Sequence, residues 1–226
     1  MAFSLRDKRA VLFDMDGVLY DSMPIHAMAW TKAMVEFGYA MTPQDVYANE
    51  GCTGEYTVRT ISAREGKGPV SDDDVRRIYS RKSEIFMSQP AAPMMPGAFE
   101  VMRRAREHGL QIQIVTGSGQ GGLIDRVQRD YAGYVVRSLM VTAFDVKRGK
   151  PFPDPYLKGL EIGGISADEA VVVENAPLGI RSARAAGIDT IAVNTGPLAD
   201  ELLLREGAAR LFPSMQALAD NWESLF

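Results

Sequence analysis

The feature that most constrains the fold is the alternation of short apolar runs with amphipathic stretches from residue 97 onward. Alternation of this kind is typical of a parallel sheet that is covered by helices on both faces. We therefore predict a doubly wound, Rossmann-like α/β fold. The predicted strands are 10–13, 111–116, 139–142, 170–175 and 190–194, and the predicted helices are 97–108, about 121–131, about 154–162, 177–186 and one from Ser214.

One segment interrupts this alternation. PIHAMAWTKAMVEFG, EYTVRTISAREG and DDDVRRIYSRKSEIFMS carry apolar residues at helical spacing, and no strand pattern occurs between residues 24 and 92. The segment closes with QPAAPMMPG, a Pro-rich passage that suits a domain boundary. We therefore predict a core domain of residues 1–22 and 93–226, with an all-helical domain of residues 23–92 inserted after the first strand.

The composition bounds the class of protein. A chain of 226 residues with 46% hydrophobic residues is long enough to bury a core. Its net charge of -4 comes from basic and acidic residues spread along the chain, so no basic stripe predicts a nucleic-acid partner. MAFSLRDKR has no apolar signal region, no run is as long as a membrane span, and one cysteine, Cys52, allows no intrachain disulfide. We expect a cytoplasmic monomer with no membrane partner.

Polar side chains follow three of the predicted strands at the point where each strand ends. In doubly wound sheets, ligands bind at the carboxyl ends of the strands, so these side chains are expected to lie together. Lys150 precedes a helix that Pro-Asp-Pro would start, and is placed to join them. The strand-end residues are Asp14 and Asp16 after AVLF, Thr116, Gly117 and Ser118 after QIQIV, and Glu174 and Asn175 after AVVV.

This set of side chains contains what phosphoryl transfer requires. A carboxylate that attacks a phosphate dianion from about 4 Å meets a repulsion of about 8 kcal/mol at an effective dielectric constant of about 20. A divalent cation and a lysine can cancel that repulsion. Mg²⁺ prefers oxygen ligands, which Asp14, Glu174 and nearby carbonyls supply. Thr116 and the amides after it suit the phosphoryl oxygens.

Each motif also has an ordinary structural explanation when it stands alone. An Asp-x-Asp-Gly sequence occurs in surface turns, although an EF-hand is excluded because its fifth loop position is Val18. Lys150 could be a solvated surface lysine, and Glu174 could end its strand in water. The coincidence of these motifs at several strand ends favours a catalytic site.

The same motifs resemble those of the haloacid dehalogenase superfamily. DMDGVLYDS, IVTGS, GKPFPDPY and VVVENAPLGI match its four signatures in order and span the whole chain. The helical insert, together with DMDGVL, VTGSG and GKP, is similar to the β-phosphoglucomutase-like branch. The resemblance implies a core of the superfamily type, a helical cap that closes over the substrate and excludes water, and Mg²⁺ as the cofactor.

The resemblance also implies a role for each matched residue. Asp14 would be the nucleophile that forms an aspartyl-phosphate. Asp16 would be the general acid and base, and its backbone carbonyl would bind Mg²⁺. Lys150 would neutralise the transferring group. The residues implied to bind the phosphoryl group are Thr116, Gly117 and Ser118.

Two departures from the branch bear on the substrate. The fourth signature carries Asn175 where the branch usually has a second carboxylate, and NEGCTGE places Gly54 where sugar-phosphate mutases have an arginine that holds the distal phosphate. The pattern resembles an inorganic pyrophosphatase of the same branch, in which a cap glutamate corresponding to Glu50 reaches the metal. That protein also has cap residues that match His26 and Lys82. Glu50 could instead be a solvated turn acid, and His26 a polar-face residue of its helix.

We therefore predict a Mg²⁺-dependent phosphohydrolase that acts on a small phosphorylated substrate, with inorganic pyrophosphate favoured. The alternatives are a β-phosphoglucomutase, a small sugar-phosphate phosphatase and a non-catalytic phosphate-binding protein. The predicted metal ligands are Asp14, Asp16, Glu174, Asn175 and Glu50. The predicted substrate contacts are Thr116, Gly117, Ser118, His26, Glu50, Lys82 and Asn175.

Overall fold

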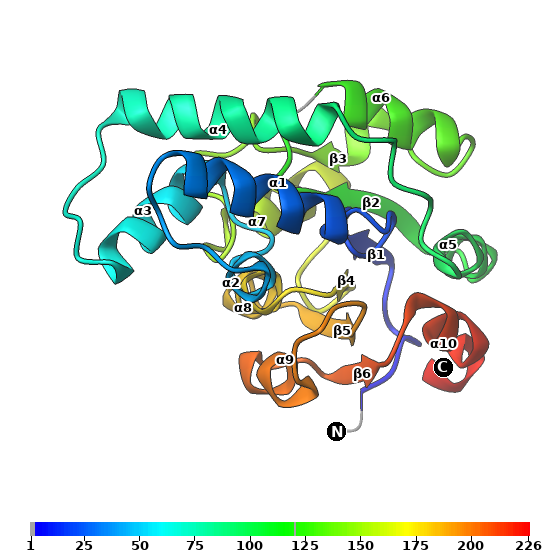
Figure 1. The fold of residues 1–226 in the computed structure, drawn as a ribbon. Helices are drawn as coiled ribbons and strands as arrows, with labels where there is room; N and C mark the ends of the chain where they lie inside the picture. The colour runs from blue at the N-terminus through cyan, green and yellow to red at the C-terminus, as the bar shows by residue number, and fades with distance from the viewer. Residues whose placement is uncertain (1–2, 120) are drawn as a thin grey trace.

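The computed structural model describes residues 3–119 and 121–226. Within these ranges, six parallel strands form one sheet in the order β3-β2-β1-β4-β5-β6 (Figure 1). Successive connections run outward from β1 to β3 and then from β4 to β6, so the direction of winding reverses between β1 and β4. This reversal opens a crevice at the carboxyl ends of the two strands. The strands are β1 (Ala10–Phe13), β2 (Gln111–Val115), β3 (Met140–Val141), β4 (Ala170–Glu174), β5 (Asp189–Val193) and β6 (Arg210–Phe212).

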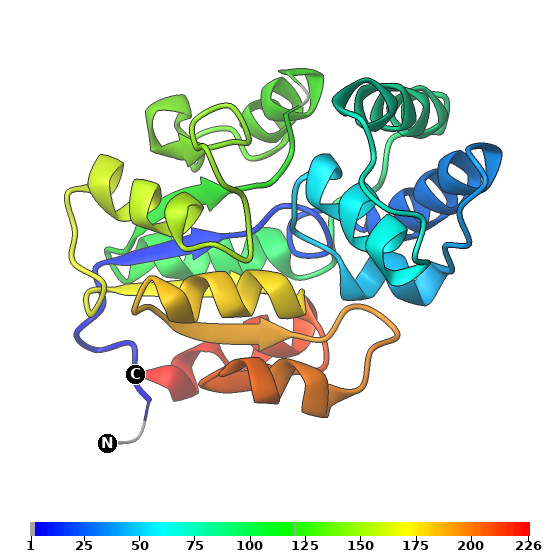
Figure 2. The same cartoon turned by 90° about the vertical axis from the view of Figure 1, so that its left-hand side faces the viewer.

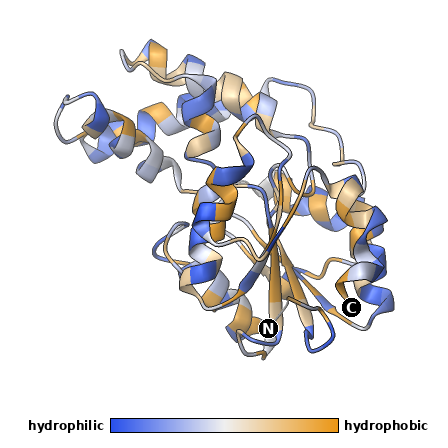
Figure 3. Ribbon diagram, turned by 90° about the horizontal axis from the view of Figure 1, so that it is seen from below, coloured by the Kyte–Doolittle hydropathy of each residue, from blue (hydrophilic) through white to orange (hydrophobic). Residues whose placement is uncertain are grey.

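Helices cover both faces of the sheet, which explains why β1 is apolar throughout and why β4 is apolar up to Glu174. In β1, Val11 and Phe13 pack on one side with α5, α6 and α10, whereas Ala10 and Leu12 pack on the other with α7 and α8. Figure 2 shows the layers and Figure 3 the apolar strands between helices with polar outer faces. The covering helices are α5 (Ala98–Glu107), α6 (Gly121–Asp130), α7 (Asp154–Gly163), α8 (Pro177–Ala185), α9 (Asp200–Glu206) and α10 (Met215–Asp220).

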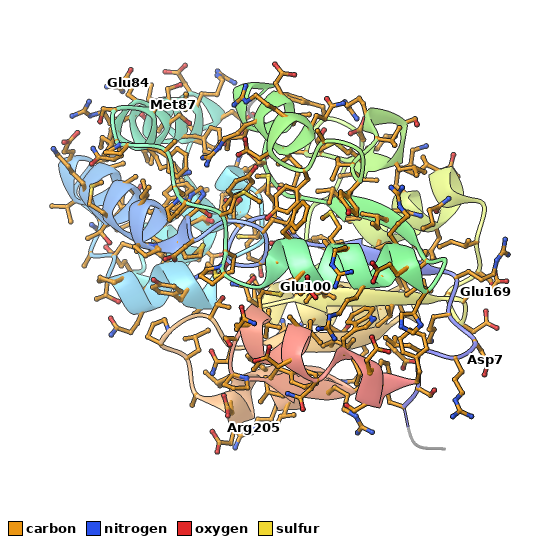
Figure 4. The ribbon with its side chains drawn as sticks, turned by 90° about the vertical axis from the view of Figure 1, so that its right-hand side faces the viewer. Asp7, Glu84, Met87, Glu100, Glu169 and Arg205 are labelled. Carbon is orange, nitrogen blue, oxygen red and sulfur yellow. The ribbon has the colours of Figure 1, made fainter. Side chains whose placement is uncertain are left out.

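The segment after β1 forms a helical cap with its own apolar cluster, which includes Trp30, Met34, Val58 and Ile78. Side chains of Thr42, Thr53 and Ser71 accept backbone hydrogen bonds at the starts of three of its helices. Glu84 and Met87 of α4 lie on the outer surface of the cap (Figure 4). The cap helices are α1 (Met23–Glu36), α2 (Pro43–Ala48), α3 (Gly54–Arg64) and α4 (Asp72–Met87).

Two adjacent segments of the chain connect the cap to the core. The segment that leaves the core pairs with the segment that returns to it at Tyr20 and Met94, and the Asp21 amide donates to the Pro93 carbonyl at 3.0 Å. Arg126 and Asp130 of α6 reinforce this junction, because Arg126 donates to the Ala92 carbonyl and Asp130 accepts from the Tyr20 hydroxyl. The hinge of the cap is therefore attached to the core on its α6 side.

The structure confirms the predicted fold class: a parallel, doubly wound sheet with a helical insert after its first strand. Three elements were not predicted, namely α2, α9 and β6. Each is seven residues or shorter, and β6 is a partly exposed edge strand, so none carries a long apolar period. No helix in the described ranges is long and apolar enough to cross a membrane.

Candidate active site

The strand-end residues predicted from the sequence do meet at one edge of the sheet. Phe13 of β1 lies in register with Ile114 of β2 and Val173 of β4. The next residues along these strands are Asp14, Val115 and Glu174, and Thr116 follows Val115. Asp14, Thr116 and Glu174 are all buried. The parallel register therefore gathers two acids and a hydroxyl where the winding of the sheet reverses.

Lys150 joins these strand ends. Its buried ammonium donates to Asp14 Oδ1 at 2.5 Å, to Glu174 Oε1 at 2.7 Å and to the Val115 carbonyl at 3.2 Å. Burial raises the pKa of Asp14 to about 8, against the opposing effect of Lys150. Burial alone would lower the pKa of Lys150, but the charges of Asp14 and Glu174 raise it well above its usual value. Lys150 is therefore a fixed cation in contact with Asp14.

Glu174 was predicted as a metal ligand, and the structure gives both of its oxygens other partners. Oε2 accepts the backbone N–H groups of Asn175 and Ala176, each at 2.9 Å. Oε1 accepts from Lys150 and, at 3.1 Å, from the Tyr156 hydroxyl. The carboxylate is thus directed at the lysine and the turn after β4. The role of Glu174 as a metal ligand stays a prediction, and the contact that the structure shows is the one with Lys150.

Asp16 faces the cap. Its Oδ1 accepts from the Ser22 hydroxyl at 2.6 Å and lies 3.2 Å from His26 Nε2. Lys82 Nζ lies 2.9 Å from His26 Nδ1. Because an ammonium can only donate, Nδ1 is the acceptor, and the proton of a neutral His26 ring is on Nε2, where it is donated to Asp16. The predicted cap residues His26 and Lys82 therefore form a chain of hydrogen bonds to Asp16.

This chain shifts the pKa of each member. Burial opposes ionisation of Asp16, but its interaction with His26, the Ser22 hydrogen bond and the Lys82 charge lower its pKa to about 2. Burial and the neighbouring Lys82 charge lower the pKa of His26. Burial also lowers the pKa of Lys82 to about 8, although its ammonium lies within 6 Å of the ring centroids of Phe86, Trp30 and Tyr79. Asp16 is thereby kept in the ionised form, which can accept a proton.

Glu50 of the cap reaches across to the core. Its Oε1 accepts from Asn175 Nδ2 at 2.7 Å, and both side chains are buried. Burial raises the pKa of Glu50 well above its usual value, and the nearby Asp14 and Glu174 charges add to this effect. Gly17, with a φ of +77°, makes room for this contact, because a Cβ there would lie 2.1 Å from Asn175 Nδ2. Glu50 is therefore a buried acid rather than a solvated one.

The donor set beside Asp14 fits Mg²⁺. Asn175 Oδ1 is buried without a hydrogen-bond partner, although its Nδ2 is paired, so this oxygen has an open coordination position. In the part of the chain that the structure covers, no group of three or more His, Cys, Asp or Glu side chains is arranged to hold a metal ion. Mg²⁺ does not need such a group, since it is commonly held by one or two carboxylates with other oxygens and water.

Thr116, Gly117 and Ser118 form the turn after β2. The Thr116 hydroxyl accepts from the Ser118 amide at 3.0 Å, and Gly117 and Ser118 border the same cavity as Asp14 and Asp16. Gly117 has no room for a side chain, because a Cβ would lie 2.8 Å from the Gly51 carbonyl oxygen of the cap. This turn therefore faces both the nucleophile candidate and the cap.

The cavity between cap and core is small, about 70 Å³. Its polar lining includes Asp14, Asp16, His26, Glu50 and Lys82. Gly54 also borders it, and a Cβ at this position would lie 2.1 Å from the Tyr79 ring. A larger side chain would therefore require Tyr79 to move. Typical ligand pockets have volumes of roughly 300–1,000 Å³, so a bulky substrate would require the cap to open.

Three residues of the site were missed from the sequence. Ser22 binds Asp16 and lies within the first motif, but its orientation depends on the start of α1. The Thr195 hydroxyl donates to the Gly17 carbonyl at 2.7 Å, and this residue lies just beyond β5, where the strand-end rule could have found it. Tyr156 carries no sequence signal, since only the packing of α7 directs its hydroxyl toward Glu174.

Comparison with known proteins gives a consistent result along the chain. The family model for haloacid dehalogenase-like hydrolases matches residues 11–193. Hexitol phosphatase A of Escherichia coli (strain K12) is 34% identical over 187 residues, which cover 82% of this chain and 83% of that protein. A phosphorylated carbohydrates phosphatase of Thermotoga maritima is 28% identical over 213 residues, or 89% of this chain and 93% of that one.

The same likeness is found among solved structures. A chain described as "putative beta-phosphoglucomutase from Bacteroides vulgatus" is 50% identical to this one and superposes with a TM-score of 0.93. The match covers 97% of this chain and 89% of that chain. The similarity therefore extends over both the sheet and the inserted helices.

Proposed function

Because the chain belongs to the haloacid dehalogenase-like hydrolases, we propose that it hydrolyses small phosphorylated compounds through a phosphoryl group carried on Asp14. The observation that carries this proposal is the buried contact of Lys150 with Asp14 at the carboxyl ends of the central strands. The presence of Asp14, Asp16, Thr116 and Lys150 around one crevice favours turnover over phosphate binding alone.

In the first step, a carboxylate oxygen of Asp14 forms a bond to phosphorus while the bond from phosphorus to the leaving oxygen breaks. Lys150 places a positive charge beside this carboxylate, which reduces its repulsion from the phosphate. The Thr116 hydroxyl and the amides that follow it would bind the phosphoryl oxygens. Closure of the cap excludes water from this step.

In the second step, water attacks the same phosphorus and the bond to Asp14 breaks, which releases phosphate and restores the carboxylate. Asp16 gives a proton to the leaving oxygen in the first step and takes the proton of the attacking water in the second, so its protonation state is restored at the end of the cycle. Ser22 and His26 orient the Asp16 carboxylate for this transfer.

The residues that would hold Mg²⁺ are Asp14, Asn175 through Oδ1, Glu50 and the backbone carbonyl of Asp16. When bound, Mg²⁺ supplies positive charge at the transferring phosphoryl group. Glu174 contributes indirectly, since its carboxylate holds Lys150.

Phosphorylated carbohydrates are the first substrate class that we propose. Support comes from the relatives, two of which are named for phosphatase activity toward a hexitol phosphate or phosphorylated carbohydrates. The sequence alone favoured inorganic pyrophosphate, but none of the relatives described above is named as a pyrophosphatase. The alternative prediction, a sugar-phosphate phosphatase or mutase, therefore has better support than the original choice.

Pyrophosphate is the second candidate because of one observation, the contact between Glu50 of the cap and Asn175 of the core. A cap acid at this position would help to hold a metal beside a compact substrate. The small cavity and the Tyr79 ring beside Gly54 also suit a compact substrate, and Gly54 itself supplies no cation for the second phosphate of a mutase cycle.

The test compares kcat/KM for a hexitol phosphate, glucose 6-phosphate, β-glucose 1-phosphate and pyrophosphate at fixed Mg²⁺, with formation of glucose 6-phosphate followed separately. We expect phosphate release to be fastest from a phosphorylated carbohydrate. Faster cleavage of pyrophosphate would replace the first candidate with the second, and net isomerisation of β-glucose 1-phosphate would identify a mutase. Release of phosphate from none of them would refute the proposed function.

Glu50→Ala distinguishes the two hydrolytic candidates further. If pyrophosphate is the substrate, this change should reduce kcat/KM much more for pyrophosphate than for simple esters, because the cap would lose its contact with the metal site. Glu55→Ala is the matched control, since Glu55 is an exposed acid on the same part of the cap and pairs with Arg59.

The domain boundaries, monomeric state and cytoplasmic location stay predictions.

A further inference from the structure

Glu174 is held on both of its oxygens, and the two sides differ in what holds them. Oε2 is fixed by two backbone N–H groups of the turn after β4, which move only with the backbone. Oε1 has two side-chain donors, Lys150 at 2.7 Å and Tyr156 at 3.1 Å. Lys150 and Tyr156 therefore hold the Oε1 side of the carboxylate by hydrogen bonds.

Lys150 cannot supply this restraint throughout the proposed reaction. Its three N–H bonds are directed at Asp14, Glu174 and the Val115 carbonyl. When Asp14 carries the phosphoryl group, the negative charge next to Lys150 moves from the carboxylate to the phosphoryl oxygens. The ammonium is then drawn toward those oxygens, and its contact with Glu174 is weakened.

We propose that Tyr156 is a positioning residue, whose hydroxyl holds Glu174 in place so that Glu174 keeps the Lys150 ammonium beside Asp14 during phosphoryl transfer. Tyr156 is fully buried in α7, and its ring centroid lies 5.0 Å from Lys150 Nζ. The ring fills space among Leu12, Val115 and Leu160. The hydroxyl is therefore the part of the side chain that serves the site rather than the core. The inference rests on the proposed roles of Asp14 and Lys150.

Tyr156→Phe tests the inference because it keeps the ring and removes only the hydroxyl. With the best substrate of the panel, we expect kcat to fall about tenfold, which corresponds to about 1.4 kcal/mol in the activation barrier. KM should change by less than about twofold, because Tyr156 does not touch the substrate. If Tyr156 had a purely structural role, Tyr156→Phe would lower the urea midpoint of unfolding but would not lower kcat selectively at a nearly unchanged KM.

Tyr131→Phe is the matched control. Tyr131 is equally buried and its hydroxyl donates one hydrogen bond, at 2.7 Å to the Leu19 carbonyl. We expect this variant to lose a similar amount of stability, measured as the urea midpoint, and to keep the wild-type kcat. If Tyr156→Phe keeps the wild-type kcat, or if both variants lose kcat equally, the inference is wrong.

A double-mutant cycle with Glu174→Gln tests the route of the effect. If Tyr156 acts through Glu174, Tyr156→Phe should cause little further loss of kcat in the Glu174→Gln background. Losses that multiply would overturn the inference, because Tyr156 would then act independently. Phenylalanine at position 156 has nearly the same shape as the wild-type tyrosine. Far-UV circular dichroism verifies that each variant is folded.

A second readout separates failure of the inference from failure of the proposed function. Beryllium trifluoride with Mg²⁺ mimics a phosphoryl group on a reactive aspartate, and its binding can be followed by thermal shift without turnover. We expect weaker binding to Tyr156→Phe than to the wild type or Tyr131→Phe. If the wild type turns over no substrate but the mimic still binds more weakly to Tyr156→Phe than to the wild type and Tyr131→Phe, the proposed function fails and the inference holds. If no variant binds the mimic and none turns over, both are refuted.

Discussion

Asp14→Asn should make the protein more stable while it abolishes turnover. Asp14, Glu174 and Lys150 are all buried and in contact, and when both acids are ionised this group has a net charge of -1. An amide at position 14 keeps an oxygen that can accept from Lys150 and leaves the group neutral. The substitution therefore removes an uncompensated buried charge along with the nucleophile.

The magnitude follows from the pKa of Asp14, which is raised from 3.8 to about 8 in the folded protein, chiefly by burial. An acid with a raised pKa binds its proton more tightly when folded, so the folded state loses stability as the pH rises from about 4 to about 8. At pH 7 the loss is at most about 4 kcal/mol, from about three pH units above the unfolded pKa at 1.36 kcal/mol each. Asp14→Asn lacks this loss.

The assay is urea unfolding followed by circular dichroism in excess chelator at pH 5, 6, 7 and 8. We expect the free energy of unfolding of Asp14→Asn to exceed that of the wild type by an amount that grows with pH, and Mg²⁺ to reduce the difference by stabilising the wild type. Asp125→Asn, the same change at an exposed acid of α6, should show no such growth. A difference that is negative at pH 8, or independent of pH, would refute the reasoning.

Two further predictions concern the reaction itself. Asp16→Ala should lower kcat by about 10² to 10⁴ while Mg²⁺ binding persists, because the variant lacks the group that exchanges protons with the leaving oxygen and the attacking water. Rapid-quench measurement of phosphate release gives the rate, and a loss of kcat of less than about tenfold would contradict this role. Activity should disappear in excess chelator and return with Mg²⁺. Ca²⁺ should bind but support little turnover, because its larger coordination sphere fits the phosphoryl group poorly. Full activity in excess chelator would contradict a metal requirement.

Local sequence patterns were sufficient to predict the sheet and the centre of the site. AVLF and AVVV are apolar and QIQIV is mostly so, because both faces of these strands are covered, and the parallel arrangement brings the residues after them to one edge. Asp14 was predicted in this way and Lys150 from the loop before a Pro-Asp-Pro helix start, and the two are in contact. The strand β6 was missed because its three residues are partly exposed and have no such pattern.

The hydrogen-bond partners of Glu174 could not be predicted from its position. Strand-end placement brought its carboxylate near Asp14, as it would for a metal ligand. Its orientation depends on the turn that follows, in which the amides of Asn175 and Ala176 bind Oε2, and on α7, from which Tyr156 binds Oε1. Such orientations arise from tertiary packing, so residue type and spacing do not determine them.

The orientation of Glu50 in the cap also depends on tertiary packing, in this case on packing of the backbone. Residues 50–53 lie against the core, where Cys52 pairs with Lys150 along the backbone and the Gly51 carbonyl approaches Gly117. Any side chain at position 117 would force the two loops apart. The lack of a side chain at Gly117 therefore lets the cap loop come close enough for Glu50 to reach Asn175. The turn that we propose to bind the phosphoryl group is thus also the turn against which the cap loop packs.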